Sequence, residues 1–195
     1  MKYTNLIRKA IKFSIKTHEV YQKQKRKGKD IAYITHPLSV GLILSLAGAD
    51  EETIVAGILH DTIEDSIDEK KVDQKMISER FGKKVADIVM SVTETDKSLP
   101  WEMRKAQAVE HVATFSHNSL LVKSADILSN MSELVDEYHR YGDGVFDRFS
   151  ADKSKVLDHY LRAIEAVLSR WKGNPLFRDL KAVANDLQLI VDNSL

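Results

Sequence analysis

Apolar residues recur at helical spacing along the whole chain, and no stretch alternates apolar and polar residues as a half-buried strand does. Leu38, Leu42 and Leu46 follow one another at intervals of four, which places them on one side of a helix. Only 3 prolines and 8 glycines interrupt the 195 residues, and most of them fall between helical patterns. The sequence therefore predicts an all-α fold, a compact multi-helix bundle.

The expected helices follow one another without a linker, repeat or low-complexity tract that would divide the chain. Pro37 suits the first turn of one helix, and Asp50 suits the N-terminus of the next. Other helices are expected at about 4–23, 120–138, 146–171 and 176–191. We expect a single domain over residues 1–195, with a core at about 1–140 and a C-terminal helical extension at about 145–193.

Composition excludes several classes of protein. The 29 Lys and Arg residues balance the 29 Asp and Glu residues, which argues against a surface that coats nucleic acid or an anionic membrane. The chain has no cysteine, so any metal must be bound by His, Asp, Glu or Asn. No run approaches the ~20 apolar residues that cross a bilayer, and the first residues do not resemble a secretory signal. We expect a cytoplasmic protein with no membrane partner.

The segment from Ile54 to Asp65 is the most informative for chemistry. An apolar run ends in His60 and Asp61, and Glu64 and Asp65 follow within one turn. Burying such groups is costly unless they are paired or bind a metal, and spacings of three and four let them face one point. The alternative is a helix that leaves the core and becomes solvated.

Two further segments favour the first interpretation. His36 stands at the start of the Pro37 helix, and Asp126 follows an apolar run at a position where a core helix expects a hydrophobic residue. Asn130 lies one turn beyond Asp126 on the same helix face. Polar residues of this kind, each at the margin of an apolar helix, together indicate a shared site.

The pattern resembles the HD-domain superfamily, whose metal site has the order H…HD…D. More closely, it is similar to the small alarmone hydrolases and to the hydrolase half of the long bifunctional alarmone enzymes. The resemblance extends over most of the chain. It rests on the segments Gln24-Lys-Arg-Lys-Gly28, Tyr33-Ile-Thr-His-Pro37, Leu59-His-Asp-Thr-Ile-Glu-Asp65, Pro100-Trp-Glu-Met-Arg-Lys105 and Lys123-Ser-Ala-Asp-Ile-Leu-Ser-Asn130.

The resemblance implies a reaction and its catalytic residues. One divalent ion, expected to be manganese (Mn2+), would be held by His36, His60, Asp61 and Asp126. Glu64 and Asp65 match the acidic pair that orients the attacking water or takes its proton. The implied reaction removes pyrophosphate from the ribose 3′ position of ppGpp or pppGpp and leaves GDP or GTP.

The resemblance also implies the substrate contacts. Five cations lie within the loop 22–29, which would cover the nucleotide with Arg26 and Lys27, although such a loop could equally be a solvated turn. The other residues expected to bind substrate are Tyr33, Arg104, Asn130, Arg148, Lys153 and Tyr160. The remaining histidines match no metal role and are interpreted as structural or surface residues: His18, His111, His117, His139 and His159.

Two other functions remain open. One is an HD hydrolase that acts on a different phosphorylated nucleotide, such as ppApp or NADPH, with the same metal centre. The other is a catalytically silent module whose basic loop binds nucleotide or RNA. Intact H…HD…D and acidic-pair residues argue against silence, and the balanced charge argues against nucleic acid. A small nucleotide is therefore the expected partner.

Overall fold

The computed structural model describes residues 3–94 and 98–193. Within these ranges the chain is helical, without any strand, as predicted. Short π- or 3-10 turns continue or join the main helices at Lys16–Tyr21, Asp68–Lys70, Val112–Thr114 and Gly142–Phe146. The α-helices are α1 (Asn5–Ile15), α2 (Thr35–Leu46), α3 (Glu51–Leu59), α4 (Gln74–Phe81), α5 (Lys83–Val92), α6 (Trp101–His111), α7 (His117–Tyr141), α8 (Lys153–Arg170) and α9 (Phe177–Asp192).

Helix α3 lies at the centre of the N-terminal half and contacts α1, α2, α5 and α7. All residues from Thr53 to Leu59 are buried, because neighbouring helices cover the helix on every side. Its start is fixed by Asp50, whose carboxylate accepts a hydrogen bond from the Thr53 backbone N–H at 2.9 Å. Because α3 is enclosed in this way, the two residues that follow its last residue, His60 and Asp61, lie in the interior of the bundle.

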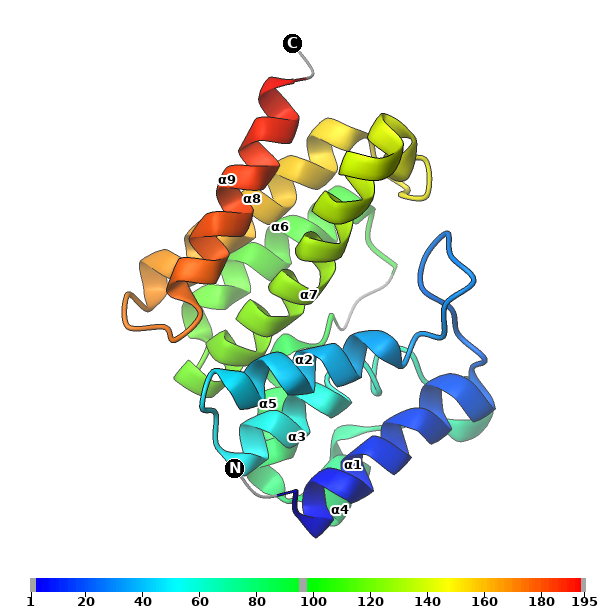
Figure 1. Ribbon diagram of the computed structural model, residues 1–195. Coiled ribbons are helices and arrows are strands. Elements are labelled where there is room, and N and C mark those ends of the chain that lie inside the picture. Colours follow the sequence, from blue (N-terminus) through cyan, green and yellow to red (C-terminus); the bar gives the residue numbers. More distant parts are fainter. Residues whose placement is uncertain (1–2, 95–97, 194–195) are drawn as a thin grey trace.

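Helix α7 joins the two halves of the molecule (Figure 1). Its 25 residues contact α2, α3 and α5 of the N-terminal half and α8 and α9 of the C-terminal half. Ser116 caps its N-terminus by accepting from the Ser119 N–H at 3.1 Å. Since α7 contacts both halves, its side chains can line a cavity formed by α2 and α3. They can also line a cavity that α8 borders.

The predicted helix at 146–171 begins later than expected, at Lys153. Gly142, with a φ of +62°, ends α7, and the chain then turns so that Val145 and Phe146 are buried. Burial of these two side chains fixes the segment as a tight turn, and Lys153 starts the helix after it. The division into a core and a C-terminal extension stays a prediction.

Among the described residues, none of the helices combines the length and apolarity required to span a bilayer.

Close packing of α2 against α3 depends on Gly57. A Cβ atom at this position would lie 2.2 Å from Cδ1 of Leu44, which is fully buried. We predict that Gly57→Ala destabilises the fold by about 1–3 kcal/mol through overpacking. Gly144→Ala is the control, because a Cβ there meets no atom within 4 Å. Thermal unfolding of both variants checks this, and equal melting temperatures would contradict the packing argument.

Candidate active site

Three helices bring four candidate metal ligands together. Nε2 of His60 lies 3.3 Å from Nε2 of His36 and 3.1 Å from Oδ2 of Asp61. Nε2 of His36 lies 3.3 Å from Oδ1 of Asp126 and 3.7 Å from Oδ2 of Asp61. Donors bound at about 2.0–2.3 Å to one ion are separated by distances of this order. The set offers imidazole and carboxylate, so it fits a divalent cation, and the donor atoms of His36, His60 and Asp126 all lie within 4.8 Å of one another.

Hydrogen bonds orient both imidazole rings. Nδ1 of His60 donates to the Gly57 carbonyl at 2.8 Å, which directs Nε2 toward the cluster. Nδ1 of His36 lies 2.9 Å from the hydroxyl of Ser129 on α7. Both histidines are buried, at 3% and 6% exposure for His36 and His60. The rings are therefore held in place before any ion binds.

The opposite charges in the cluster shift the pKa values of its members. Burial opposes a charge on His60, but the adjacent carboxylates of Asp61 and Asp126 outweigh it and raise its pKa to about 9. Burial likewise opposes ionisation of Asp61, yet His60 lowers the pKa of that carboxyl. For Asp126, Lys123 and His36 outweigh burial in the same direction and lower its pKa. The carboxylates are thus ionised at neutral pH, as ligands must be.

Both candidate carboxylate ligands are also fixed by hydrogen bonds. The Tyr33 hydroxyl donates to Oδ2 of Asp61 at 2.6 Å. Oδ1 of Asp126 accepts from Nδ2 of Asn130 at 2.7 Å, and its Oδ2 accepts from Nζ of Lys123 at 2.8 Å. Tyr33 and Asn130, predicted as substrate contacts, therefore also position the candidate ligands.

The structure separates the two residues of the acidic pair. Glu64 lines a cavity of about 140 Å³ together with the four candidate ligands. Asp65 does not line this cavity, and its Oδ2 accepts from Nε2 of Gln24 at 3.0 Å. Gln24 in turn contacts Nδ1 of the buried His18 at 3.0 Å. Glu64 therefore lies beside the candidate ligands, whereas Asp65 ties the basic loop to the segment that follows α3.

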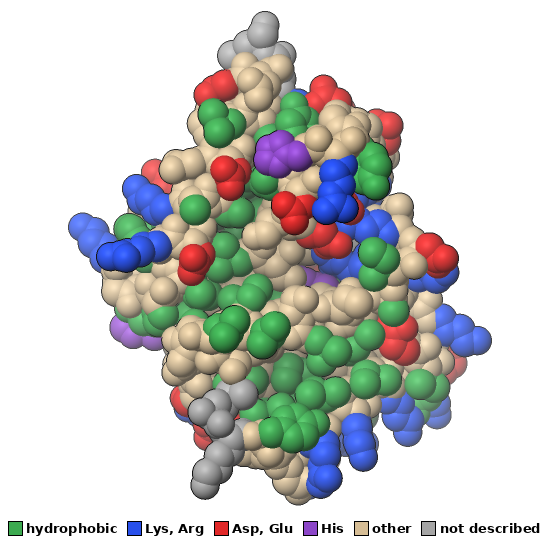
Figure 2. All heavy atoms as spheres, viewed as in Figure 1, with side chains coloured by type: hydrophobic (Ala, Val, Ile, Leu, Met, Phe, Trp, Pro, Cys, Tyr) green, Lys and Arg blue, Asp and Glu red, His purple; other side chains and the backbone are tan. Residues whose placement is uncertain are grey.

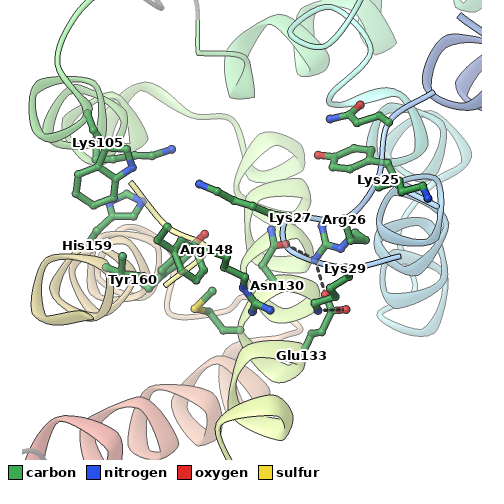
Figure 3. A pocket seen from close by; sticks show the side chains of 16 residues that line it. Lys25, Arg26, Lys27, Lys29, Lys105, Asn130, Glu133, Arg148, His159 and Tyr160 are labelled. Atoms are coloured by element: carbon green, nitrogen blue, oxygen red, sulfur yellow. Dashed lines mark hydrogen bonds and ion pairs between the residues drawn. The ribbon is translucent and has the colours of Figure 1, made fainter. Parts of the chain in front are cut away.

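A larger cleft of about 440 Å³ (Figure 3) opens beside the cavity that the four candidate ligands line, which we call the metal cavity. It contains most of the predicted substrate residues, which come from the basic loop and the segment that follows it, from α7 and the segment after it, and from α8. The two cavities share five lining residues: Tyr33, Lys105, Asn130, His159 and Tyr160. The predicted substrate residues that line the large cleft are Arg26, Lys27, Tyr33, Asn130, Arg148 and Tyr160.

Ion pairs attach the basic loop to α7. A guanidinium nitrogen of Arg26 donates to Oδ1 of Asn130 at 2.8 Å and to Glu133 at 2.5 Å. Lys29 pairs with Glu133 at 2.5 Å and with Glu137. Figure 3 shows Arg26, Lys29 and Glu133 together, and Figure 2 shows acidic and basic side chains side by side on this face of the molecule. The loop is therefore a structured wall of the cleft, unlike a solvated turn.

Lys27 faces the cleft without a counter-charge. Its Nζ lies over the Phe149 ring at 5.3 Å, and no ion pair involves it within residues 3–94 and 98–193. Burial, together with the positive charges of Lys105 and Arg148, lowers its pKa. Cations gathered in this way favour binding of a polyanion.

Two predicted substrate residues lie elsewhere. Arg104 does not line the cleft, because its NH1 pairs with Glu94 at 2.9 Å and it borders a different cavity. Lys153 is directed away by a 2.6 Å ion pair with Asp143, and its Nζ lies 4.9 Å from the centre of the Tyr138 ring. Neither residue lines the two cavities that adjoin the candidate ligands, and their role in substrate binding stays a prediction.

Sequence reasoning also missed residues. His159, interpreted as structural or surface, lines both cavities together with Lys105 from α6. Glu94 and Lys123 border the metal cavity as well. On α8, the signal available in the sequence was the spacing of Val156, His159 and Tyr160, which places the three on one helix face.

A family model described as an HD domain matches residues 10–153, which is more than half of the chain. The chain belongs to the HD-domain family. HD domains depend on a divalent metal, and the cluster around His36, His60 and Asp126 supplies suitable ligands.

Several relatives of this HD domain have hydrolase names, and others are named GTP pyrophosphokinase. It is 38% identical over 133 residues to guanosine-3′,5′-bis(diphosphate) 3′-pyrophosphohydrolase MESH1 of Danio rerio, covering 67% of this chain and 70% of the relative. It is 35% identical over 131 residues to a protein of the same activity name from Aquifex aeolicus, covering 66% of this chain but 18% of that longer relative.

Solved structures share the fold. A structure described as a metazoan ortholog of SpoT that hydrolyses ppGpp has a TM-score of 0.72 at 21% identity and covers 100% of this chain and 98% of its own. The crystal structure of lmo0812 from Listeria monocytogenes has a TM-score of 0.70 at 31% identity, with coverage of 80% and 97%. This chain therefore shares its helical fold with both structures.

Metal binding should release a proton. The pKa of His60 is raised from 6.5 to about 9 before an ion binds, so between these values the ring is protonated and an ion must displace that proton. We predict that affinity for Mn2+ weakens as pH falls below about 9, by up to about tenfold per pH unit. Calorimetry in two buffers with different ionisation enthalpies measures the protons released. Affinity that is constant from pH 6 to pH 9 would disprove the proton displacement.

Proposed function

We propose that this HD domain is a manganese-dependent hydrolase that removes the 3′-pyrophosphate of ppGpp and pppGpp. The observation that carries the proposal is the position of the donor cluster. His36, His60, Asp61 and Asp126 lie at the end of a cleft lined by cations from several elements. The activity names of the relatives support the choice of reaction. The products would be GDP or GTP and pyrophosphate.

The four ligand residues would hold the ion through two imidazoles and carboxylate oxygens, a donor set suited to Mn2+. When bound, such an ion polarises a phosphoryl oxygen and lowers the pKa of water. Glu64 lies in the same cavity and would accept the proton of the attacking water. Asp65 would act indirectly, by positioning Gln24 and the basic loop.

The cleft would hold the rest of the nucleotide. Lys27 and Arg148 would bind phosphate oxygens, with Arg148 able to do so in a bidentate manner. Asn130 and Tyr160 lie between the cleft and the metal cavity, where the ribose must sit if its 3′ phosphate reaches the ion. We propose a cytoplasmic enzyme whose partner is this small nucleotide, with residues 1–195 acting as one domain.

A substrate panel tests the proposal directly. The protein would be incubated with Mn2+ and ppGpp, pppGpp, ppApp or NADPH, and the products separated by chromatography. Release of pyrophosphate from the guanosine substrates is expected. Phosphate release from NADPH alone, or no turnover of any nucleotide, would refute the assignment.

Removing a ligand and removing the base should have different effects. Asp61→Asn should abolish activity and weaken Mn2+ binding, because it takes one anionic donor from the cluster. Glu64→Gln should retain the ion but slow turnover by about 10²-fold, the scale of lost acid–base assistance. Calorimetry with Mn2+ and steady-state kinetics separate the two effects. Equal loss of metal in both variants would reassign Glu64 as a ligand.

The unpaired lysine should contribute to affinity more than to turnover. Lys27→Ala should raise KM for ppGpp by about 10- to 100-fold with little change in kcat, because a charged hydrogen bond is lost in ground and transition states alike. Arg26→Lys should also raise KM, since an ammonium on a shorter side chain does not replace the guanidinium nitrogen that contacts both Asn130 and Glu133. Lys75→Ala, on the exposed surface of α4, is the control. Unchanged KM in both loop variants would leave the loop without a role in binding.

A further inference from the structure

The bond that is cleaved must lie where the two cavities meet. This position of the bond rests on the proposed function, in which the ribose occupies the larger cleft and its 3′ phosphate reaches the metal cavity. Five side chains border both cavities: Tyr33, Lys105, Asn130, His159 and Tyr160. The group that contacts the oxygen between ribose and phosphorus is expected among them.

Three of the five already have partners. The Tyr33 hydroxyl donates to Asp61, and the Lys105 ammonium pairs with Glu94. Asn130 uses both ends of its amide, since Nδ2 donates to Asp126 and Oδ1 accepts from Arg26. The Tyr33 and Asn130 donors are thus engaged by the candidate ligands, and the Lys105 ammonium is held by a carboxylate.

The other two, His159 and Tyr160, form no hydrogen bond within the described ranges of the chain, and the proposed function places Tyr160 beside the ribose, which leaves His159 for the ester oxygen. Its ring packs edge-on against Trp101 of α6, with centroids 5.9 Å apart, and lies 5.0 Å from the ring of Tyr160. No hydrogen bond or ion pair of His159 occurs within the two described ranges of the chain. Figure 3 shows His159 and Tyr160 on α8, on the cleft wall that also carries Lys105. The aromatic contacts hold the ring while its nitrogens remain available to the cavities.

The surroundings of His159 keep it uncharged. Burial and the positive charges of Lys105 on α6 and Lys123 on α7 lower its pKa to about 3. The carboxylates of Glu94 and Asp126 act in the opposite direction and are outweighed. A neutral imidazole has one N–H, so it can donate a hydrogen bond but has no extra proton to transfer near neutral pH.

We infer that His159 is a catalytic residue whose neutral ring donates a hydrogen bond to the 3′ ester oxygen of the substrate. Water attacks phosphorus, the bond between phosphorus and the 3′ oxygen breaks, and negative charge develops on that oxygen. A fixed N–H directed at this atom binds more strongly as the charge grows, so it stabilises the transition state more than the bound substrate. The oxygen receives its proton from solvent after the bond breaks, and Glu64 takes the proton of the attacking water.

The test compares a residue that keeps the donor with one that removes it. His159→Phe should lower kcat for ppGpp by about 10²-fold with a small change in KM, the effect of losing one donor at developing charge. His159→Gln, which retains an N–H donor, should remain within about tenfold of the original kcat. His139→Gln, on the exposed end of α7, is the control, and circular dichroism verifies that each variant is folded.

The pH profile separates hydrogen bonding from proton transfer. Since the ring stays neutral, the wild-type protein and His159→Gln should lose activity at the same pH on both limbs. An unchanged kcat in His159→Phe would overturn the inference. A second result would also overturn it: a His159→Gln variant that loses as much activity as His159→Phe and lacks the basic limb of the wild-type pH profile. His159 would then be a proton donor.

A binding measurement distinguishes this inference from the proposed function. In the ring ¹⁵N NMR spectrum of the full chain with Mg2+ as a diamagnetic ion, inorganic pyrophosphate should shift the His159 signals while they remain those of a neutral imidazole. This result is expected even if ppGpp were not the substrate, because the probe needs only the phosphate side of the junction. Signals unaffected by saturating pyrophosphate, or a ring that becomes protonated, would refute the contact.

Discussion

Burial of a His-Asp pair at the end of a fully enclosed helix is the constraint on which the rest of the structure depends. Ionisable groups in an apolar interior destabilise a fold unless other charges or hydrogen bonds compensate them. Here His60 contacts the Gly57 carbonyl and Asp61, and Asp61 accepts from the Tyr33 hydroxyl. These contacts bring α2, α3 and the segment after the basic loop to one place, so the site is part of the packing of the N-terminal half.

Polar residues of helix α7 connect the candidate metal ligands to the cleft. The spacing of its polar residues by three and four places them in one row on the helix. Members of the row contact the candidate metal ligands at one end and the basic loop at the other, with Asn130 touching both Asp126 and Arg26. The row is Lys123, Asp126, Asn130, Glu133 and Glu137. The Asn130 amide therefore connects the basic loop directly to a candidate ligand.

The sequence predicts the elements of this arrangement better than its contacts. The helical fold and the convergence of His60 with His36 follow from apolar spacing and from the cost of burying polar groups. The positions of Lys153 and Arg104 outside the cleft do not follow from the sequence, because a surface cation can pair with whichever carboxylate the tertiary structure brings near, here Asp143 and Glu94. His159 was overlooked for the related reason that the cleft it faces is formed by helices distant in the sequence.

The contact between Gly28 and Arg148 links the basic loop to the C-terminal half. Gly28 has a φ of +71°, and a Cβ atom there would lie 3.0 Å from Cβ of Arg148. Arg148 also pairs with Glu137 at 2.5 Å. This ion pair is largely shielded from water, because the Arg148 side chain is only 16% exposed. Shielded pairs respond weakly to salt, whereas long-range attraction of a polyanion is strongly screened. Ionic strength would thus slow the capture of substrate while leaving the wall that receives it intact.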